Sequence, residues 1–83
     1  MNTIRRKFWA GMFGDGIRIN RESAGLSIEE AARLAGMETS EWGAVEAGCV
    51  PDLDLLRPMA DAMSIRYDKL ATMVALCREA WEL

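Results

Sequence analysis

The sequence predicts an all-α fold, and three observations support that prediction. Residues that favour helices (Ala, Leu, Met, Arg and Glu) are prominent throughout the 83 residues. No alternating run of β-branched or aromatic residues is long enough for a strand. Gly and Pro recur at intervals suited to short helices joined by tight connections. Because a chain of this length provides only one hydrophobic core, we expect a single compact domain of five helices.

A short extension is expected to precede the first helix of the domain. Gly11, Gly14 and Gly16 lie close together in the sequence, and glycine weakens helices. We therefore divide the chain into an N-terminal arm or short helix over residues 1–12 and a helical domain over residues 13–83, with a break or fraying near the glycines.

The stretch over residues 13–24 is the expected first helix of that domain. It places Phe13, Ile17 and the stem of Arg21 on one helical face. Gly25 then supplies a stop signal.

The two central helices give the clearest local signal. Ser27 and Glu30 have the spacing of a capping box, and Gly36 ends the helix that they begin. The next helix starts at Glu38 or Thr39 and closes before another glycine. Two helices of about eight residues, joined by a turn of about three or four, form a helix-turn-helix pattern.

Two more helices complete the prediction. The fourth begins near Asp54 or is kinked at Pro58, because an internal proline removes a backbone hydrogen bond. The fifth runs over residues 67–82. The apolar residues that recur at helical spacing along the fifth helix are Leu70, Met73, Val74, Cys77 and Trp81. The side chains expected to face inward from the fourth helix are Leu53, Leu56, Met59, Ala60 and Met63.

From about residue 13 to residue 70 the order of features resembles the XRE, or lambda-repressor-like, helix-turn-helix family. The stretches that carry this resemblance are RESAGLSIEEAARLAGM, WGAVEAGCVPDLDLL and MADAMSI. The resemblance implies that Arg21 and Glu46 form a scaffold salt bridge between the first helix and the recognition helix. Arginine suits that contact because its planar guanidinium can bind a carboxylate through two hydrogen bonds.

The positions that contact DNA in this family hold unusual residues here. Ile28 stands where the family usually has a polar residue, and Glu38 stands where a serine usually leaves the helix amides free for phosphate. The residues that follow include none of the Arg, Lys, Gln or Asn side chains that bind guanine or adenine with two hydrogen bonds. The expected outward positions of the recognition helix are Thr39, Ser40, Glu41, Gly43 and Ala44.

The charge distribution of the sequence also argues against DNA binding. The formal net charge is −3, with six basic and four acidic residues over 1–33 but four basic and nine acidic residues over 34–83. Proteins that bind nucleic acids usually present a basic surface to the phosphates, so we expect weak or absent DNA binding. The candidate phosphate contacts are Arg5, Arg6, Lys7 and Arg33.

Several function classes find no support in the sequence. Histidine is absent, and Cys49 and Cys77 are too few for a metal site, so we expect no enzyme activity, metal or cofactor. Neither a leader peptide nor a run long enough for a membrane span is visible, and we expect a cytoplasmic protein with reduced thiols. Trp42 is expected in the core, whereas Trp9 and Trp81 either pack on each other or belong to an interface.

We therefore expect a small transcriptional regulator that acts by binding a protein, either as a monomer or as a weak homodimer. The chain is similar to small helix-turn-helix antiactivators of mobile-element transfer, and this resemblance implies that the two central helices mask a transcriptional activator. Ile28 is expected to face solvent and to provide a central apolar contact. The alternative is a sequence-specific repressor that binds operator DNA with its basic N-terminal arm, Thr39 and Ser40.

Overall fold

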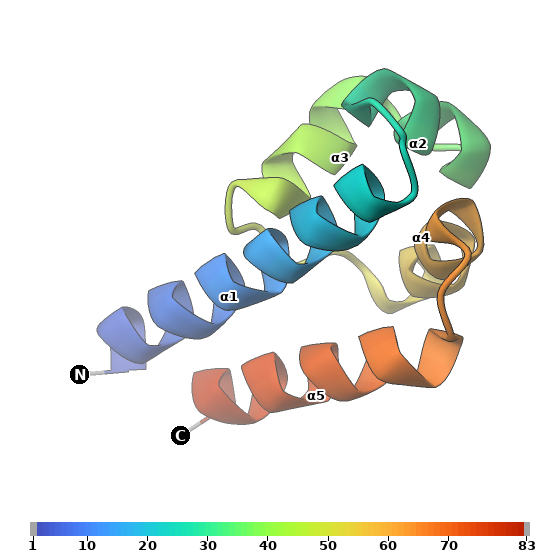
Figure 1. Ribbon diagram of the computed structural model, residues 1–83. Coiled ribbons are helices and arrows are strands. Elements are labelled where there is room, and N and C mark those ends of the chain that lie inside the picture. Colours follow the sequence, from blue (N-terminus) through green and yellow to red (C-terminus); the bar gives the residue numbers. More distant parts are fainter. Residues whose placement is uncertain (1, 83) are drawn as a thin grey trace.

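Two antiparallel helices form the long side of the molecule, and three shorter helices pack against one end of this pair (Figure 1). Helix α1 (Asn2–Ser23) lies beside the C-terminal helix α5 (Tyr67–Glu82). The shorter helices are α2 (Ile28–Ala35), α3 (Thr39–Glu46) and α4 (Leu56–Met63). The computed structural model describes the backbone of residues 2–82 and the side chains of residues 8 and 10–75. Within that part the fold is all-α, as predicted, with five α-helices and no strand.

Helix α1 is longer and more regular than the sequence predicts. It continues without a break through all three glycines, so the expected interruption near residues 11–16 is wrong. Two of the glycines have a packing role. A Cβ atom on Gly14 would lie 2.6 Å from the carbonyl oxygen of Glu46, and one on Gly16 would lie 2.6 Å from Cε of Met73. The small residues therefore let α1 approach the end of α3 and the side of α5 closely.

The hydrophobic core lies where these helices meet. Trp42 of α3 is completely buried, which confirms the prediction that it belongs to the core. Leu53 is 55% exposed, so the prediction that it faces inward is wrong. The largest fully buried side chains are Phe13, Ile17, Trp42, Leu56, Met59, Leu70 and Val74.

The start of α4 explains how Pro58 is tolerated. A short 3₁₀ helix, η1 (Leu53–Leu55), precedes α4, which begins at Leu56 rather than near Asp54. Pro58 therefore lies in the first turn of α4, where its missing N–H would have had no partner within the helix. The proline needs no kink, because the regular helix starts late enough to accommodate it.

Several side chains named in the sequence analysis lie outside the described residues. The backbone of each of these residues belongs to α1 or α5. The side chains in question are those of Arg5, Arg6, Lys7, Trp9, Cys77 and Trp81.

The close approach at Gly14 gives a direct test of the packing. Gly14→Ala should lower the free energy of unfolding by about 1–3 kcal/mol, because the new methyl group meets backbone atoms of α3 that cannot move aside alone. Gly11 is the matched control, since a Cβ atom there meets nothing within 4 Å. Gly11→Ala should instead stabilise the domain by about 0.5–1 kcal/mol. Equal effects in urea denaturation would contradict this account of the α1–α3 contact.

Candidate functional site

The helix-turn-helix unit, defined here as residues 28–46, begins with the predicted capping box. The Ser27 hydroxyl accepts a hydrogen bond from the Glu30 amide at 3.1 Å, and the Glu30 carboxylate accepts one from the Ser27 amide at 3.0 Å. The second of these bonds, to the backbone, is the main reason that the pKa of Glu30 lies below its ordinary value. At the other end of α2, Gly36 adopts a left-handed conformation with φ 69°. This geometry turns the chain sharply from α2 into α3.

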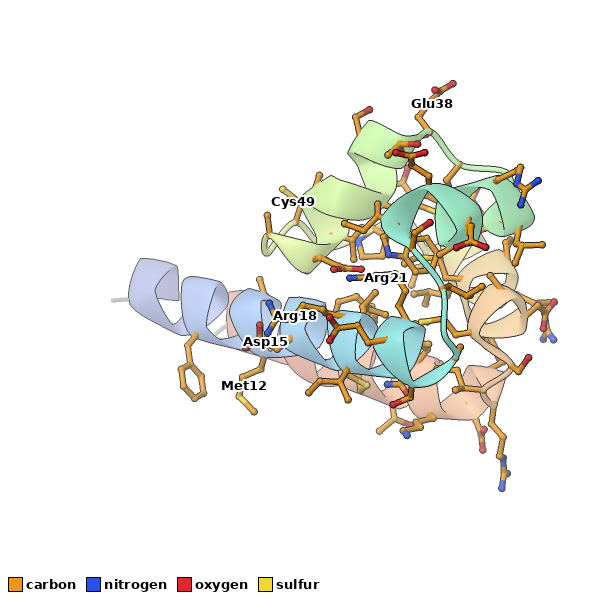
Figure 2. All side chains as sticks on the ribbon, turned by 45° about the horizontal axis from the view of Figure 1, so that its top comes forward. Met12, Asp15, Arg18, Arg21, Glu38 and Cys49 are labelled. Carbon is orange, nitrogen blue, oxygen red and sulfur yellow. The ribbon has the colours of Figure 1, made fainter. Side chains whose placement is uncertain are left out.

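The Glu46 carboxylate at the end of α3 binds Arg21 of α1. Nε of Arg21 donates to Oε2 of Glu46 at 2.6 Å, and Nη2 of Arg21 donates to Oε1 at 3.0 Å. The remaining Arg21 nitrogen, Nη1, donates to the carbonyl of Leu26 at 2.8 Å, which fixes the loop between α1 and α2. Figure 2 shows Arg21 pointing from α1 toward α3. The structure thus brings together the two residues that the family resemblance implies as a scaffold pair.

Trp42 belongs to the same network. Its indole Nε1 donates to Oε2 of Glu46 at 2.6 Å. The side chains of Arg21 and Glu46 are only 10% and 8% exposed, so the pair is shielded from water. Among the described side chains, no buried nitrogen or oxygen is left without a hydrogen-bond partner. The polar groups buried in this part of the core are therefore compensated.

The charges of this network reinforce each other. Burial raises the pKa of Glu46, but the hydrogen bonds from Arg21 and Trp42 and the charge of Arg21 outweigh burial and leave that pKa below its ordinary value. The hydrogen bonds that Arg21 donates to the Glu46 carboxylate raise the pKa of Arg21. Both groups are consequently charged at neutral pH, and each stabilises the charge of the other.

The N-terminus of α3 is acidic. Glu38 is the N-cap residue, and its amide donates to Oε1 of Glu41 at 3.0 Å. Thr39 and Ser40 are exposed beside these carboxylates, and Figure 2 shows Glu38 projecting from the surface. A helix N-terminus normally attracts anions through its free amides and its dipole. Here carboxylates of the protein itself occupy that region.

The remaining residues expected on this face are less exposed than predicted. Ile28 is half-buried and packs against the hydrophobic core, so the expectation that it faces solvent is wrong. It is the first residue of α2, and the apolar face of that helix extends to this first turn. Gly43 and Ala44 are also half-buried, but a Cβ atom on Gly43 would meet nothing within 4 Å. The surface at Gly43 is therefore open to another molecule.

Few basic side chains accompany this surface. The helix-turn-helix unit contains five acidic residues and one basic residue, Arg33, which is exposed on α2. Arg18 pairs with Asp15 on α1 at 3.1 Å, and the guanidinium of Arg57 stacks on the ring of Tyr67 at 4.3 Å. The structure therefore gathers no basic patch around α3 from the side chains that it describes.

Sequence reasoning missed a groove beside α3. We call it the α3–η1 groove, since it lies between α3 and the segment that leads into η1. Its lining includes Ala44 and Val45 of α3, Cys49 and Asp52 of the loop, and Leu55 of η1. These residues come together only because the loop folds back along α3, and no local pattern in the sequence signals that path.

The chain also matches a known family. The family model described as the helix-turn-helix domain matches residues 13–78. The chain belongs to this helix-turn-helix family. No curated protein and no solved structure matches the chain. Helix-turn-helix domains are regulatory domains of a DNA-binding type, in which the second helix of the unit lies in the major groove. The corresponding helix of this chain is α3.

Other kinds of site find no support in the described part of this helix-turn-helix domain. The described residues include no group of three or more His, Cys, Asp or Glu that could hold a metal ion. Nor is any helix in the described part long and apolar enough to cross a membrane. Cys49 is a free, exposed cysteine at the edge of the α3–η1 groove.

The buried carboxylate gives a pH-dependent prediction. Glu46→Gln should lower the free energy of unfolding at pH 7 by about 3 kcal/mol, because the charge of Arg21 is left unpaired in the core. Folding depresses the pKa of Glu46. The stabilisation that its charge provides is therefore fully present above the ordinary pKa of 4.5 and is lost as the pH falls through the lower pKa of the folded state. The difference in the free energy of unfolding between wild type and Glu46→Gln should therefore become smaller below pH 4.5.

Urea denaturation at a series of pH values measures this difference. Glu29→Gln is the matched control, because Glu29 is exposed on α2. Its effect should stay within about 0.5 kcal/mol. A Glu46→Gln variant as stable as the control at pH 7 would show that the Arg21 contact does not hold the domain together.

Proposed function

We propose that this helix-turn-helix protein is a transcriptional regulator that acts as an antiactivator, binding a transcriptional activator instead of reading operator DNA. The observation that carries the proposal is the pair of carboxylates, Glu38 and Glu41, at the N-terminus of α3. In a helix-turn-helix complex this end of the recognition helix lies closest to the base edges and phosphates. The proposal assigns the same surface to a protein partner.

The electrostatic argument concerns the phosphates. Affinity for DNA depends largely on basic side chains that release counterions from the phosphate backbone. Around α3 the described side chains offer the exposed Arg33, whereas Glu38 and Glu41 repel phosphates. Glu41 also accepts the amide hydrogen of Glu38, and a phosphate approaching this end would compete with that bond. Binding of DNA through α3 is therefore disfavoured.

The second argument concerns base reading. Thr39 and Ser40 have short side chains, and Gly43 has none. None of them can form the paired hydrogen bonds that distinguish guanine or adenine in the major groove. Small side chains instead allow another protein to approach the backbone of α3 closely.

Operator binding remains the second candidate, because the family is of a DNA-binding type and its match covers residues 13–78. On that alternative, contacts would come from Arg33, from the basic residues near the start of α1, and from Thr39 and Ser40. The two candidates predict opposite behaviour in a DNA titration.

The first experiment measures binding to DNA. At physiological salt, the wild-type protein should bind a random-sequence duplex more weakly than the usual non-specific range of about 10⁻⁴–10⁻⁶ M. The double variant Glu38→Ser, Glu41→Gln removes the repulsive charges and should bind more tightly, with an affinity that falls as salt is raised. Fluorescence anisotropy measures both affinities. Selection of a specific duplex that wild type binds at nanomolar concentration would support operator binding and contradict our proposal.

The second experiment separates folding from partner binding. Gly43→Ala adds a methyl group into open space, so it should stabilise α3 by about 0.5–1 kcal/mol. The same methyl group should hinder close approach and weaken binding to the activator at least tenfold. Gly11→Ala makes the same change on α1 and should leave binding unchanged.

The measurement requires a transcriptional activator identified by affinity capture from the cells that contain this protein. Isothermal titration of the purified activator with each variant then gives the affinities. Equal affinities for Gly43→Ala, Gly11→Ala and wild type would contradict the assignment of α3 as the contact surface.

A further inference from the structure

We propose that the α3–η1 groove is the docking site for one particular kind of segment: a protein segment with a single large apolar side chain flanked by lysine or arginine. This inference rests on the proposed function and names the chemistry that the partner should present. It is carried by the apolar floor of the groove and by the sign of the charges at its rim.

The groove has the size and lining for one anchoring side chain. Its volume is about 210 Å³, which is below the range of roughly 300–1,000 Å³ typical of small-molecule sites. Met37 and Val45 form part of its lining and are 8% and 4% exposed, and the half-buried Leu55 lines it from η1. Filling this space with an apolar side chain would remove the exposed parts of these residues from water.

The rim of the groove is uniformly acidic. Among the described residues, Glu41 on α3 and Asp52 before η1 are the only charged members of its lining, and both are exposed. The Asp52 carboxylate makes no capping hydrogen bond to η1, and Glu41 uses only Oε1 to accept the amide hydrogen of Glu38. Carboxylate oxygens on both sides therefore remain available to basic side chains that flank an apolar anchor.

The other occupants fit less well. A DNA backbone carries the same sign of charge as the rim and offers nothing for the apolar floor. An uncharged apolar ligand would fill the floor but would bring no basic group to the carboxylates of Glu41 and Asp52. A basic segment with an apolar anchor satisfies both parts of the groove, and protein interfaces commonly combine a buried anchor with a polar rim.

A phage-displayed library of random dodecapeptides provides the probe. Selection on the full-length protein should enrich peptides with a large apolar residue between basic residues. In ¹⁵N-labelled protein, the best peptide should shift the amide resonances of Ala44, Cys49 and Val50, which all line the groove. Asp52→Lys should weaken the peptide at least tenfold at low salt. Asp61→Lys is the matched control, because Asp61 is exposed on α4 and outside the groove lining, and it should weaken the peptide less than twofold.

A third variant tests the apolar floor. Ala44→Trp places a large side chain at the groove and should abolish peptide binding while the circular dichroism spectrum stays that of the folded domain. If Ala44→Trp does not fold, two other measurements still decide whether the peptide binds in the groove. They are the peptide-induced changes in the amide resonances of wild type and the comparison of Asp52→Lys with Asp61→Lys.

The outcomes distinguish this inference from the proposed function. Equal peptide affinities for Asp52→Lys and Asp61→Lys, or enriched peptides without basic residues, would overturn the inference. Shifts confined to Thr39, Ser40 and Gly43 would overturn it and leave protein binding through α3 intact. A selection that enriches no peptide at all would also overturn the inference. None of these peptide results bears on the proposed function, which the DNA titration and the Gly43→Ala comparison test separately.

Discussion

The Glu46 carboxylate is the interaction on which the arrangement of the helix-turn-helix unit depends. It receives hydrogen bonds from Arg21 on α1 and from Trp42 one turn earlier on α3, while Arg21 also binds the loop carbonyl of Leu26. Two helices and the connection between α1 and α2 therefore share one buried ionic network. A domain of 83 residues has a small core, so the orientation of α3 relies on this directional contact as well as on apolar burial.

The contact at Gly14 complements that network. The absence of a side chain lets α1 lie against the carbonyl groups at the end of α3, close to the carboxylate that Arg21 binds. Hydrogen bonding and close packing thus constrain the same pair of helices. Helix α3 is consequently held from its C-terminal end, whereas its acidic N-terminal end projects toward solvent.

The sequence predicts the parts of the fold that depend on local chemistry. Ser27 and Glu30 determine where α2 begins, and Gly36 determines where it ends, because capping and left-handed backbone are properties of neighbouring residues. The predicted interruption of α1 is wrong because the continuity of this helix depends on a tertiary contact and not on local chemistry. Glycine propensity describes an isolated helix, but Gly14 is retained in a continuous helix whose packing against α3 requires a small residue. The partial burial of Ile28 and the formation of the α3–η1 groove likewise depend on tertiary contacts that no local pattern specifies.

The antiparallel pairing of α1 and α5 has a practical consequence for work with this domain. The beginning of α1 and the end of α5 lie at the same end of the molecule, whereas the turn between α2 and α3 lies at the opposite end (Figure 1). A tag, a dye or a surface linker joined to the beginning of α1 or to the end of α5 would leave the turn between α2 and α3 uncovered. Two copies joined head to tail through a short flexible linker could each present α3 independently, and such a tandem protein would bind a dimeric target with increased avidity.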